Sequence, residues 1–172
     1  GLDLIEFILD FNDSKANPLM SQTGINEIIR ISGKTGVSVK TICADYFMDA
    51  PLHSVDAGMA GESFRTLERL LITAKALNIT DIVIPCVDMS SLKSMEAVDR
   101  FVHQVTKIIP NIEGENINLS LETDLEPIGF LELLNKLNSK NITINYDVGN
   151  SAALGYDPAE ELNIYGDRIS DI

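Results

Sequence analysis

The sequence predicts an α/β fold in which parallel strands alternate with helices, organised as part of a (β/α)₈ barrel. The hydrophobic period switches repeatedly between short runs typical of strands and longer patterns typical of helices, which indicates βαβ units. The expected strands begin about 25 to 44 residues apart, which suits a barrel that typically has about 250 residues. We therefore expect residues 1–172 to form a single domain, an incomplete barrel of about six parallel strands and an internal portion of the complete one.

An open doubly wound sheet is the alternative architecture for the same alternation of strands and helices. That fold typically carries a glycine-rich phosphate-binding turn after an early strand. The sequence has neither a G-x-G-x-x-G segment nor a Walker-type loop. The barrel is therefore the preferred prediction.

Six short segments have the apolar composition of strands, and turn-forming or polar residues bound them. The expected strands begin near Asp3, Val37, Asp81, Ile117, Ile142 and Arg168.

Apolar residues recur at helical spacing between these strands, which predicts amphipathic helices. Gly36 and Asn78 are expected to end two of the helices. Before the last strand, Asp157 can cap a helix, Pro158 suits its first position, and Glu160 completes a capping box. The clearest apolar stripes are Phe64, Leu67, Leu71 and Ala74; Val98, Phe101, Val102, Val105, Ile108 and Ile109; and Phe130, Leu133, Leu134 and Leu137.

Two expected strands, INLSLE (117–122) and ITINYD (142–147), end on a carboxylate. Side chains alternate across a strand, so Glu122 and Asp147 share the face of the polar residues of their strands. If the two strands are parallel neighbours, both acids converge at the carboxyl end of the sheet, where such folds bind ligands. Two converging carboxylates predict a divalent cation. Solvated turn residues are the competing interpretation, because DVGN (147–150) is a typical turn sequence.

Composition favours an ordinary water-soluble domain. Thirteen basic and 26 acidic residues give a net charge of −13, which disfavours binding to nucleic acid and to anionic lipid. No apolar run approaches the roughly 20 residues of a membrane span, and no signal peptide is recognisable. Cys43 and Cys86 lack the spacing of a zinc site or a disulfide scaffold and are expected to pack as small apolar groups. We therefore expect a cytoplasmic location.

Four segments resemble the sugar phosphate isomerase/epimerase group of the xylose-isomerase-like TIM barrels: ADYF (44–47), LETD (121–124), NYDVGN (145–150) and AALGY (152–156). The resemblance covers nearly the whole chain. It implies a metal-dependent isomerase or epimerase that acts on a sugar or sugar phosphate, with proton transfer through an enediolate. The partner is then a small molecule.

The resemblance also implies the roles of individual residues. Glu122 is a metal ligand and the catalytic proton-transfer base, and Asp147 is a metal ligand only. A His and a second Glu complete the family's ligand set, and both are expected beyond Ile172, so the isolated chain should not support full catalysis. Oxygen ligands favour one Mn²⁺ or Mg²⁺ ion, whereas the expected His would admit Co²⁺ or Zn²⁺.

Other acidic and polar residues near strand ends are candidate substrate-binding groups. Glu6 interrupts the apolar run LIEFIL (4–9), so its carboxylate must be paired, hydrated or facing the barrel interior. Asp45 follows the second expected strand, and Asn150 could hydrogen-bond a sugar hydroxyl or hold a turn. Asp88 and Asp124 also follow strands and are expected mainly in loops or behind the site.

Residues 46–63 are expected to form a long loop that could close over a substrate, with Phe47 and Met48 as its apolar lining. His53 is the only histidine in this loop, and a lone loop histidine is usually incidental. His103 falls on a helical pattern and is expected at or near the surface.

Three other functions remain open at this point. A polyol dehydratase could use the same metal-binding barrel. An endonuclease acting at abasic DNA sites needs several metals, more histidines and a basic surface, which two histidines and strong acidity disfavour. A non-catalytic sugar-binding relative could keep the fold without the reaction. An incomplete barrel exposes strand edges, so a homo-oligomer is also possible.

Overall fold

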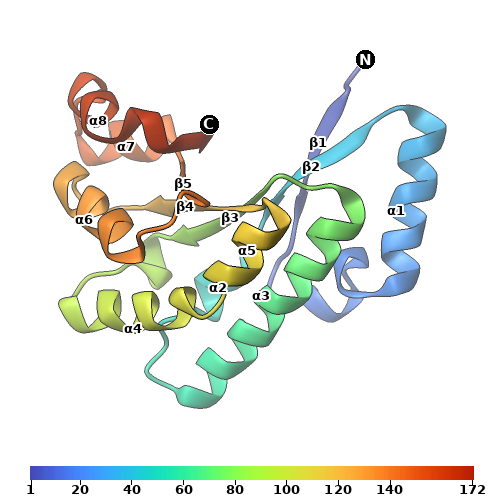
Figure 1. Cartoon of the computed structure of the whole chain (residues 1–172), viewed down its shortest axis with the longest axis horizontal. Coiled ribbons are helices and arrows are strands. Elements are labelled where there is room, and N and C mark those ends of the chain that lie inside the picture. The colour runs from blue at the N-terminus through green and yellow to red at the C-terminus, as the bar shows by residue number, and fades with distance from the viewer.

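A computed structural model describes all residues, 1–172, and contains one six-stranded parallel sheet with the strand order β1-β2-β3-β4-β5-β6 (Figure 1). Each strand pairs with the next one in the sequence, and helices connect them. This confirms the predicted fold class, a partial (β/α)₈ barrel, and the expected strand starts hold to within one residue. The strands are β1 (Leu4–Ile8), β2 (Ser38–Cys43), β3 (Asp81–Cys86), β4 (Asn118–Thr123), β5 (Ile142–Asn145) and β6 (Ile169–Asp171).

Helices cover the sheet and pack on one another, α1 on α3, α4 on α6 and α6 on α8. Figure 1 shows α3 and α4 below the strands and α6 at their left end, with α7 and α8 above α6. The helices are α1 (Gln22–Thr35), α2 (Tyr46–Asp49), α3 (Ala57–Leu77), α4 (Met95–Thr106), α5 (Ile109–Glu115), α6 (Pro127–Leu137), α7 (Val148–Leu154) and α8 (Pro158–Tyr165). Short 3₁₀ turns occupy Ser14–Ala16, Pro18–Met20, Asp88–Ser90 and Gly166–Arg168.

The two faces of the sheet differ as the alternation of residues predicts. Leu119 and Leu121 of β4 are fully buried in the hydrophobic core, where they join apolar side chains of the helices. Between them, the Ser120 hydroxyl lies 3.1 Å from a carboxylate oxygen of Asp81 and 2.9 Å from the hydroxyl of Thr143. Polar side chains of neighbouring strands therefore satisfy one another on the face opposite the core.

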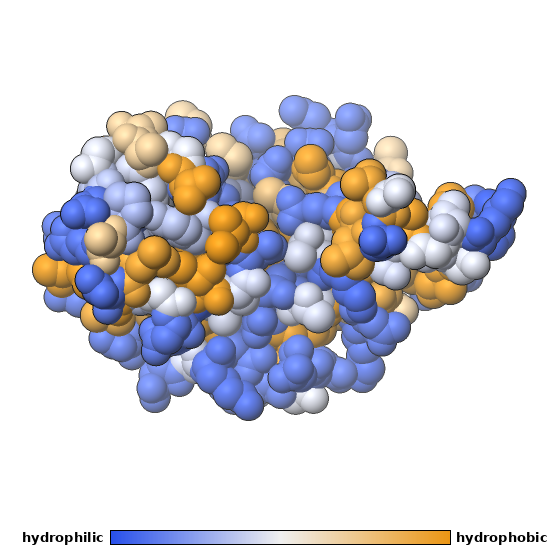
Figure 2. All heavy atoms as spheres, turned by 90° about the horizontal axis from the view of Figure 1, so that it is seen from above, coloured by the Kyte–Doolittle hydropathy of each residue, from blue (hydrophilic) through white to orange (hydrophobic).

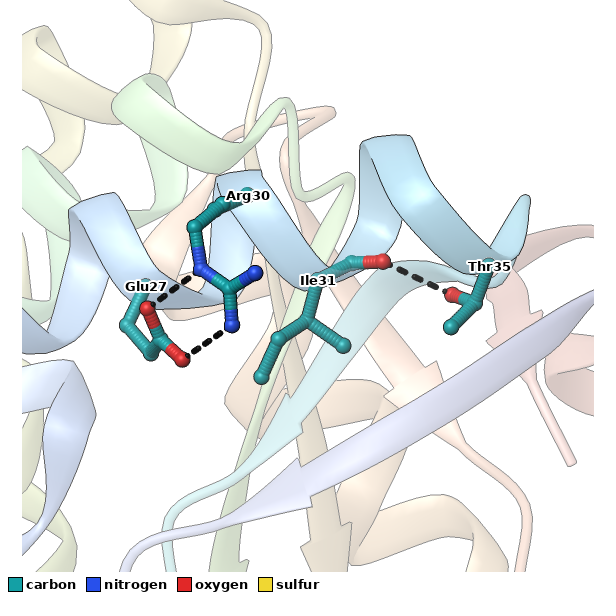
Figure 3. A network of polar contacts seen from close by, with 4 residues as sticks. All are labelled: Glu27, Arg30, Ile31 and Thr35. Atoms are coloured by element: carbon teal, nitrogen blue, oxygen red, sulfur yellow. Dashed lines mark hydrogen bonds and ion pairs between the residues drawn. The ribbon is translucent and has the colours of Figure 1, made fainter.

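Helix ends follow the expected local rules. Ser21 caps α1, because its hydroxyl accepts a hydrogen bond from the amide of Gly24 at 3.1 Å. Gly36 ends the same helix with φ of 78°, a left-handed conformation that glycine adopts without strain. In the last turns, Thr35 donates to the carbonyl of Ile31, and Arg30 pairs with Glu27 on the exposed side (Figure 3). Asn78 ends α3 in the same left-handed conformation, as predicted.

Gly24 faces the backbone of Pro18 so closely that a methyl group at this position would overlap the Pro18 carbonyl. We expect Gly24→Ala to lower the free energy of unfolding by about 1–3 kcal/mol, the usual cost of overpacking. Gly33→Ala in the same helix is the control, since its added methyl meets no atom, and it should stabilise by about 0.4–1 kcal/mol. Urea unfolding midpoints measure both changes. Equal midpoints for the two variants would contradict this packing.

The apolar stripe expected to run from Val98 to Ile109 is divided between two helices. Helix α4 ends at Thr106, and α5 begins at Ile109 with Pro110 in its first turn. Proline has no amide hydrogen and its ring clashes with the carbonyl four residues earlier, so a single helix cannot continue through position 110.

The prediction of a long loop over residues 46–63 was wrong. The stretch forms α2, a seven-residue connection and the first turns of α3, so residues 50–56 alone lack regular structure. Phe47 and His53 are 1% and 7% exposed and pack in the interior instead of lining a substrate cleft. Phe47 and Leu52 are therefore part of the core and anchor this connection, whereas Met48 is half-buried and Val55 is exposed.

Strand β1 forms one edge of the sheet and carries exposed apolar side chains, including Leu4 and Ile8, which are 58% and 51% exposed. Hydrophobic side chains also interrupt the mainly hydrophilic surface in Figure 2.

None of the helices is long and apolar enough to cross a lipid bilayer.

Candidate active site

The carboxyl ends of β4 and β5 bring together four polar side chains. Glu122 lies in β4, Asn145 ends β5, and Asp147 and Asn150 lie at the start of α7. Pairing of Ser120 with Thr143 sets the register of the two strands, which places Glu122 beside Asn145 on the polar face. All four side chains line one small cleft.

Two side-chain amides hold the carboxylate of Glu122. Asn145 donates to one oxygen at 2.9 Å, and Asn150 donates to the other at 2.7 Å. The two bonds come from opposite sides of the bend between β5 and α7, so together they fix the orientation of the carboxylate. Asn150 therefore contacts Glu122 directly.

Asp147 is the N-cap of α7. One of its carboxylate oxygens accepts hydrogen bonds from the amides of Gly149 at 2.7 Å and Asn150 at 3.0 Å. This is the usual way in which aspartate satisfies the free amides at a helix start. The second oxygen of Asp147 accepts no hydrogen bond from the chain, which leaves it available to a ligand.

Negative charge accumulates at this end of the sheet. Burial raises the pKa of Glu122, and the nearby carboxylates of Asp147 and Asp45 raise it further against the lowering effect of the Asn145 amide. Burial likewise raises the pKa of Glu6, with contributions from Asp171 and Asp45. These five acids come from five different strands or the loops that follow them. A bound cation would relieve their mutual repulsion.

The residues present fit part of the ligand set of a hard divalent cation. Glu122 and Asp147 offer carboxylate oxygens, which Mg²⁺ and Mn²⁺ prefer, and no positively charged side chain pairs with either of them. The chain contains no group of three or more His, Cys, Asp or Glu side chains gathered closely enough to hold a metal ion. Two carboxylates are therefore what residues 1–172 bring to such a site.

The whole chain, residues 1–172, matches the family described as xylose isomerase-like TIM barrel. The chain belongs to this family. No curated protein matches the sequence.

Solved structures with the same xylose isomerase-like barrel include sugar epimerases. A D-tagatose 3-epimerase-like protein is 18% identical with a TM-score of 0.78, and the match covers 100% of this chain and 66% of that one. D-psicose 3-epimerase from Clostridium cellulolyticum H10 is 15% identical with a TM-score of 0.77, covering 98% and 61%. A xylose isomerase domain protein from Planctomyces limnophilus is 13% identical with a TM-score of 0.77, covering 98% and 63%.

The coverage shows that this chain spans less than two thirds of the length of those three structures. At such low identity the comparison establishes the shared fold.

Other acidic residues named from the sequence lie around the site in different settings. Asp45 accepts a hydrogen bond from the Cys43 thiol, whose sulfur is 3.1 Å away, and burial raises the pKa of that thiol, so it stays protonated. Glu6 lies on the edge strand β1 of the barrel, where its side chain is only partly covered. Asp124 accepts from the Ser91 hydroxyl at 2.6 Å and so ties together two loops. Asp88 is exposed, with φ of 49°.

Two residues at this end of the barrel were missed by sequence reasoning. Asn145, which holds Glu122, lies two positions before Asp147 and thus on the same face, a signal that could have been used. Asp171 ends β6, and burial raises its pKa, with the charge of Asp81 adding to the effect. It lies at the carboxyl end of a strand as Glu122 does, so the same rule would have found it.

Neither histidine lies in the site. His103 is exposed on α4, as predicted. His53 packs edge-on against Phe101 with 6.2 Å between ring centroids, and its Nδ1 has no hydrogen-bond partner. Burial lowers the pKa of His53, and the charge of Arg100 lowers it further.

This setting predicts a pH-dependent stability. Between the lowered folded pKa and the unfolded pKa of about 6.5, the unfolded chain binds a proton at His53 that the folded chain does not bind. Stability is therefore complete above about pH 6.5 and falls as the pH drops through the folded pKa, with a slope of at most about 1.4 kcal/mol per unit. His53→Phe should remove this contribution from the unfolding free energies measured between about pH 7 and 5. His103→Gln is the control, and a wild-type profile matching that of His53→Phe would contradict the prediction.

Proposed function

We propose that the full-length protein is a metal-dependent isomerase or epimerase of a sugar or sugar phosphate. The observation that carries the proposal is the carboxylate of Glu122, half-buried, held by two amides and placed next to Asp147 at the carboxyl end of the sheet. Solved structures of the same fold include epimerases of tagatose and psicose type, which supports this reaction class.

The metal would be held by Glu122 and by the free oxygen of Asp147. The resemblance to sugar isomerases implies a His and a second Glu as further ligands, outside residues 1–172. When bound, such an ion polarises substrate oxygens and stabilises the negative charge that develops on them. Oxygen ligands favour Mn²⁺ or Mg²⁺, and a His would admit Co²⁺ or Zn²⁺.

Glu122 would also accept the proton from the carbon next to the substrate carbonyl. A carboxylate whose pKa is raised by burial and by neighbouring acids is a stronger base than one in water. The amides of Asn145 and Asn150 fix its direction, so the proton acceptor is oriented before the substrate binds.

Substrate hydroxyls would be held by Glu6, Asp45 and Asn150. Asp45 adds to the negative charge near Glu122, and Glu6 lies near Asp171 and Asp45. Carboxylates are good acceptors for the many hydroxyl donors of a sugar. Asn150 already donates one amide hydrogen to Glu122, which leaves its second hydrogen and its oxygen for the substrate.

We further propose that residues 1–172 are one portion of a single barrel domain that acts in the cytoplasm and associates with further copies of itself. Both cysteines, Cys43 and Cys86, are free thiols, which suits a reducing compartment. The exposed apolar side chains of the edge strand β1 favour pairing of this edge with a strand of another copy.

The test uses full-length protein stripped of metal, titrated with Mn²⁺ while its melting temperature is recorded, and then assayed with ketoses and aldoses, with and without phosphate. We expect a rise in melting temperature and conversion of at least one sugar. No response to Mn²⁺ would overturn the proposal. A metal response with loss of water from a polyol would instead identify a dehydratase, and binding of sugars without conversion would identify a non-catalytic relative.

A further inference from the structure

Glu161 of α8 is the most deeply buried carboxylate in the chain, with 1% of its surface exposed. None of the ion pairs of the chain includes it. Three hydroxyl groups donate to it instead. One oxygen accepts from Tyr146 at 2.8 Å, and the other accepts from Ser151 at 2.9 Å and from Tyr165 at 2.7 Å.

Burying a charged group without a partner is costly, so such a group is kept only where hydrogen bonds compensate for the lost water. An apolar residue at position 161 would avoid the cost altogether. The position faces the buried rings of Tyr146 and Tyr165, which are 6% and 3% exposed. The chain instead carries an acid there with three donors arranged around it, which indicates that these hydrogen bonds hold the donor residues in fixed positions.

Two of the three bonds bracket the segment that carries the candidate metal ligand. Tyr146 directly precedes Asp147, and Ser151 directly follows Asn150. The carboxylate of Glu161 therefore holds residues 146–151 at both ends. Inside the bracket, the amide of Ser151 donates to the carbonyl of Asp147 at 3.1 Å, which closes the first turn of α7.

The third hydrogen bond stays within α8. Tyr165 lies four residues after Glu161 in the same helix, α8, so its hydroxyl ties the carboxylate to its own helix. Its hydroxyl donates no hydrogen bond to residues 146–151. The network thus offers an internal comparison between bonds that reach the site and one that does not.

We propose that Glu161 is a positioning residue, which fixes residues 146–151 so that Asp147 and Asn150 face Glu122. The inference rests on the proposed function, because it concerns the geometry of the same metal-binding side chains. Loss of a hydrogen-bonded partner behind a metal ligand typically lowers metal affinity about 10- to 100-fold, which sets the size of the expected effect.

The test measures Mn²⁺ dissociation constants of the metal-free full-length protein by electron paramagnetic resonance, together with melting temperatures. Glu161→Gln should weaken Mn²⁺ binding at least about 10-fold. Tyr146→Phe and Ser151→Ala should each weaken it several-fold. Tyr165→Phe should lower the melting temperature about as much as Tyr146→Phe does and leave the dissociation constant within about twofold. Glu160→Gln, on the exposed side of the same helix, should change neither.

The outcomes separate the two proposals. If the wild type binds Mn²⁺ and Glu161→Gln binds it with the same affinity, the positioning role alone is overturned. If Glu161→Gln fails to fold, equal affinities in Tyr146→Phe and Tyr165→Phe overturn it instead. A wild type that does not bind Mn²⁺ overturns the proposed function and the positioning role together.

Discussion

Replacing Glu122 with glutamine is expected to lower kcat/KM for the sugar substrate by about 10²- to 10⁴-fold, the usual contribution of a general base. The variant keeps the size of the side chain, and its amide can accept from one of Asn145 and Asn150 and donate to the side-chain oxygen of the other once that amide turns over. The metal-free variant should be at least as stable as the wild type at neutral pH. Because the folded pKa of Glu122 is raised, its ionisation above the unfolded pKa destabilises the fold, and glutamine does not ionise.

Steady-state kinetics and urea unfolding of the metal-free protein provide the two readouts. Glu126→Gln is the matched control, because Glu126 lies four residues away, is exposed and makes no side-chain capping bond. Full activity in Glu122→Gln would contradict the role of this carboxylate as the base. A large loss of stability in the metal-free variant would instead show that Glu122 is primarily structural.

The second large effect is expected at Asp147, where a pair of substitutions separates its two roles. Asp147→Asn keeps an oxygen that can accept from Gly149 and Asn150, and asparagine caps helices about as well as aspartate. Its stability should therefore change little, while Mn²⁺ affinity should fall more than about 100-fold, beyond the loss typical of residues behind the ligands. Asp147→Ala should lose the metal and also about 0.5–2 kcal/mol of stability through the missing cap.

Isothermal titration with Mn²⁺ and thermal unfolding of both variants measure these effects. Asp157→Asn is the control, since Asp157 caps α8 in the same way through the amide of Ala159 and lies outside the proposed metal site. Mn²⁺ affinity that is equal in wild type and Asp147→Asn would leave Asp147 as a helix cap alone.

Much of this arrangement could be predicted because it depends on local rules. The alternation of side chains along β4 placed Glu122 on the face opposite the core, and the register of Ser120 with Thr143 brings the end of β5, two residues before Asp147, beside it. The end of α1 at Gly36 and the start of α8 at Asp157 follow from backbone conformation and capping, which act within a few residues.

The rest depends on contacts between distant residues. Helices α2 and α7 have four and seven residues, too short for a helical period to be recognised, and α2 forms because buried Phe47 packs in the core. The bond from Asn145 to Glu122 requires the pairing of two strands. The three donors of Glu161 come from the residue after β5, from α7 and from α8, and nothing in the spacing of tyrosines and serines indicates that they meet.

The most direct test of the central claim, proton transfer by Glu122 next to a sugar carbonyl, follows hydrogen exchange in D₂O. Full-length protein with Mn²⁺ is incubated with a panel of ketoses, and proton NMR records the signal of the hydrogen on the carbon next to the carbonyl. The account predicts that deuterium replaces this hydrogen in at least one sugar with the wild type and at a rate lower by about 10²- to 10⁴-fold with Glu122→Gln. Metal-loaded wild type that exchanges no sugar hydrogen, or a Glu122→Gln variant that exchanges it at the wild-type rate, would contradict the account.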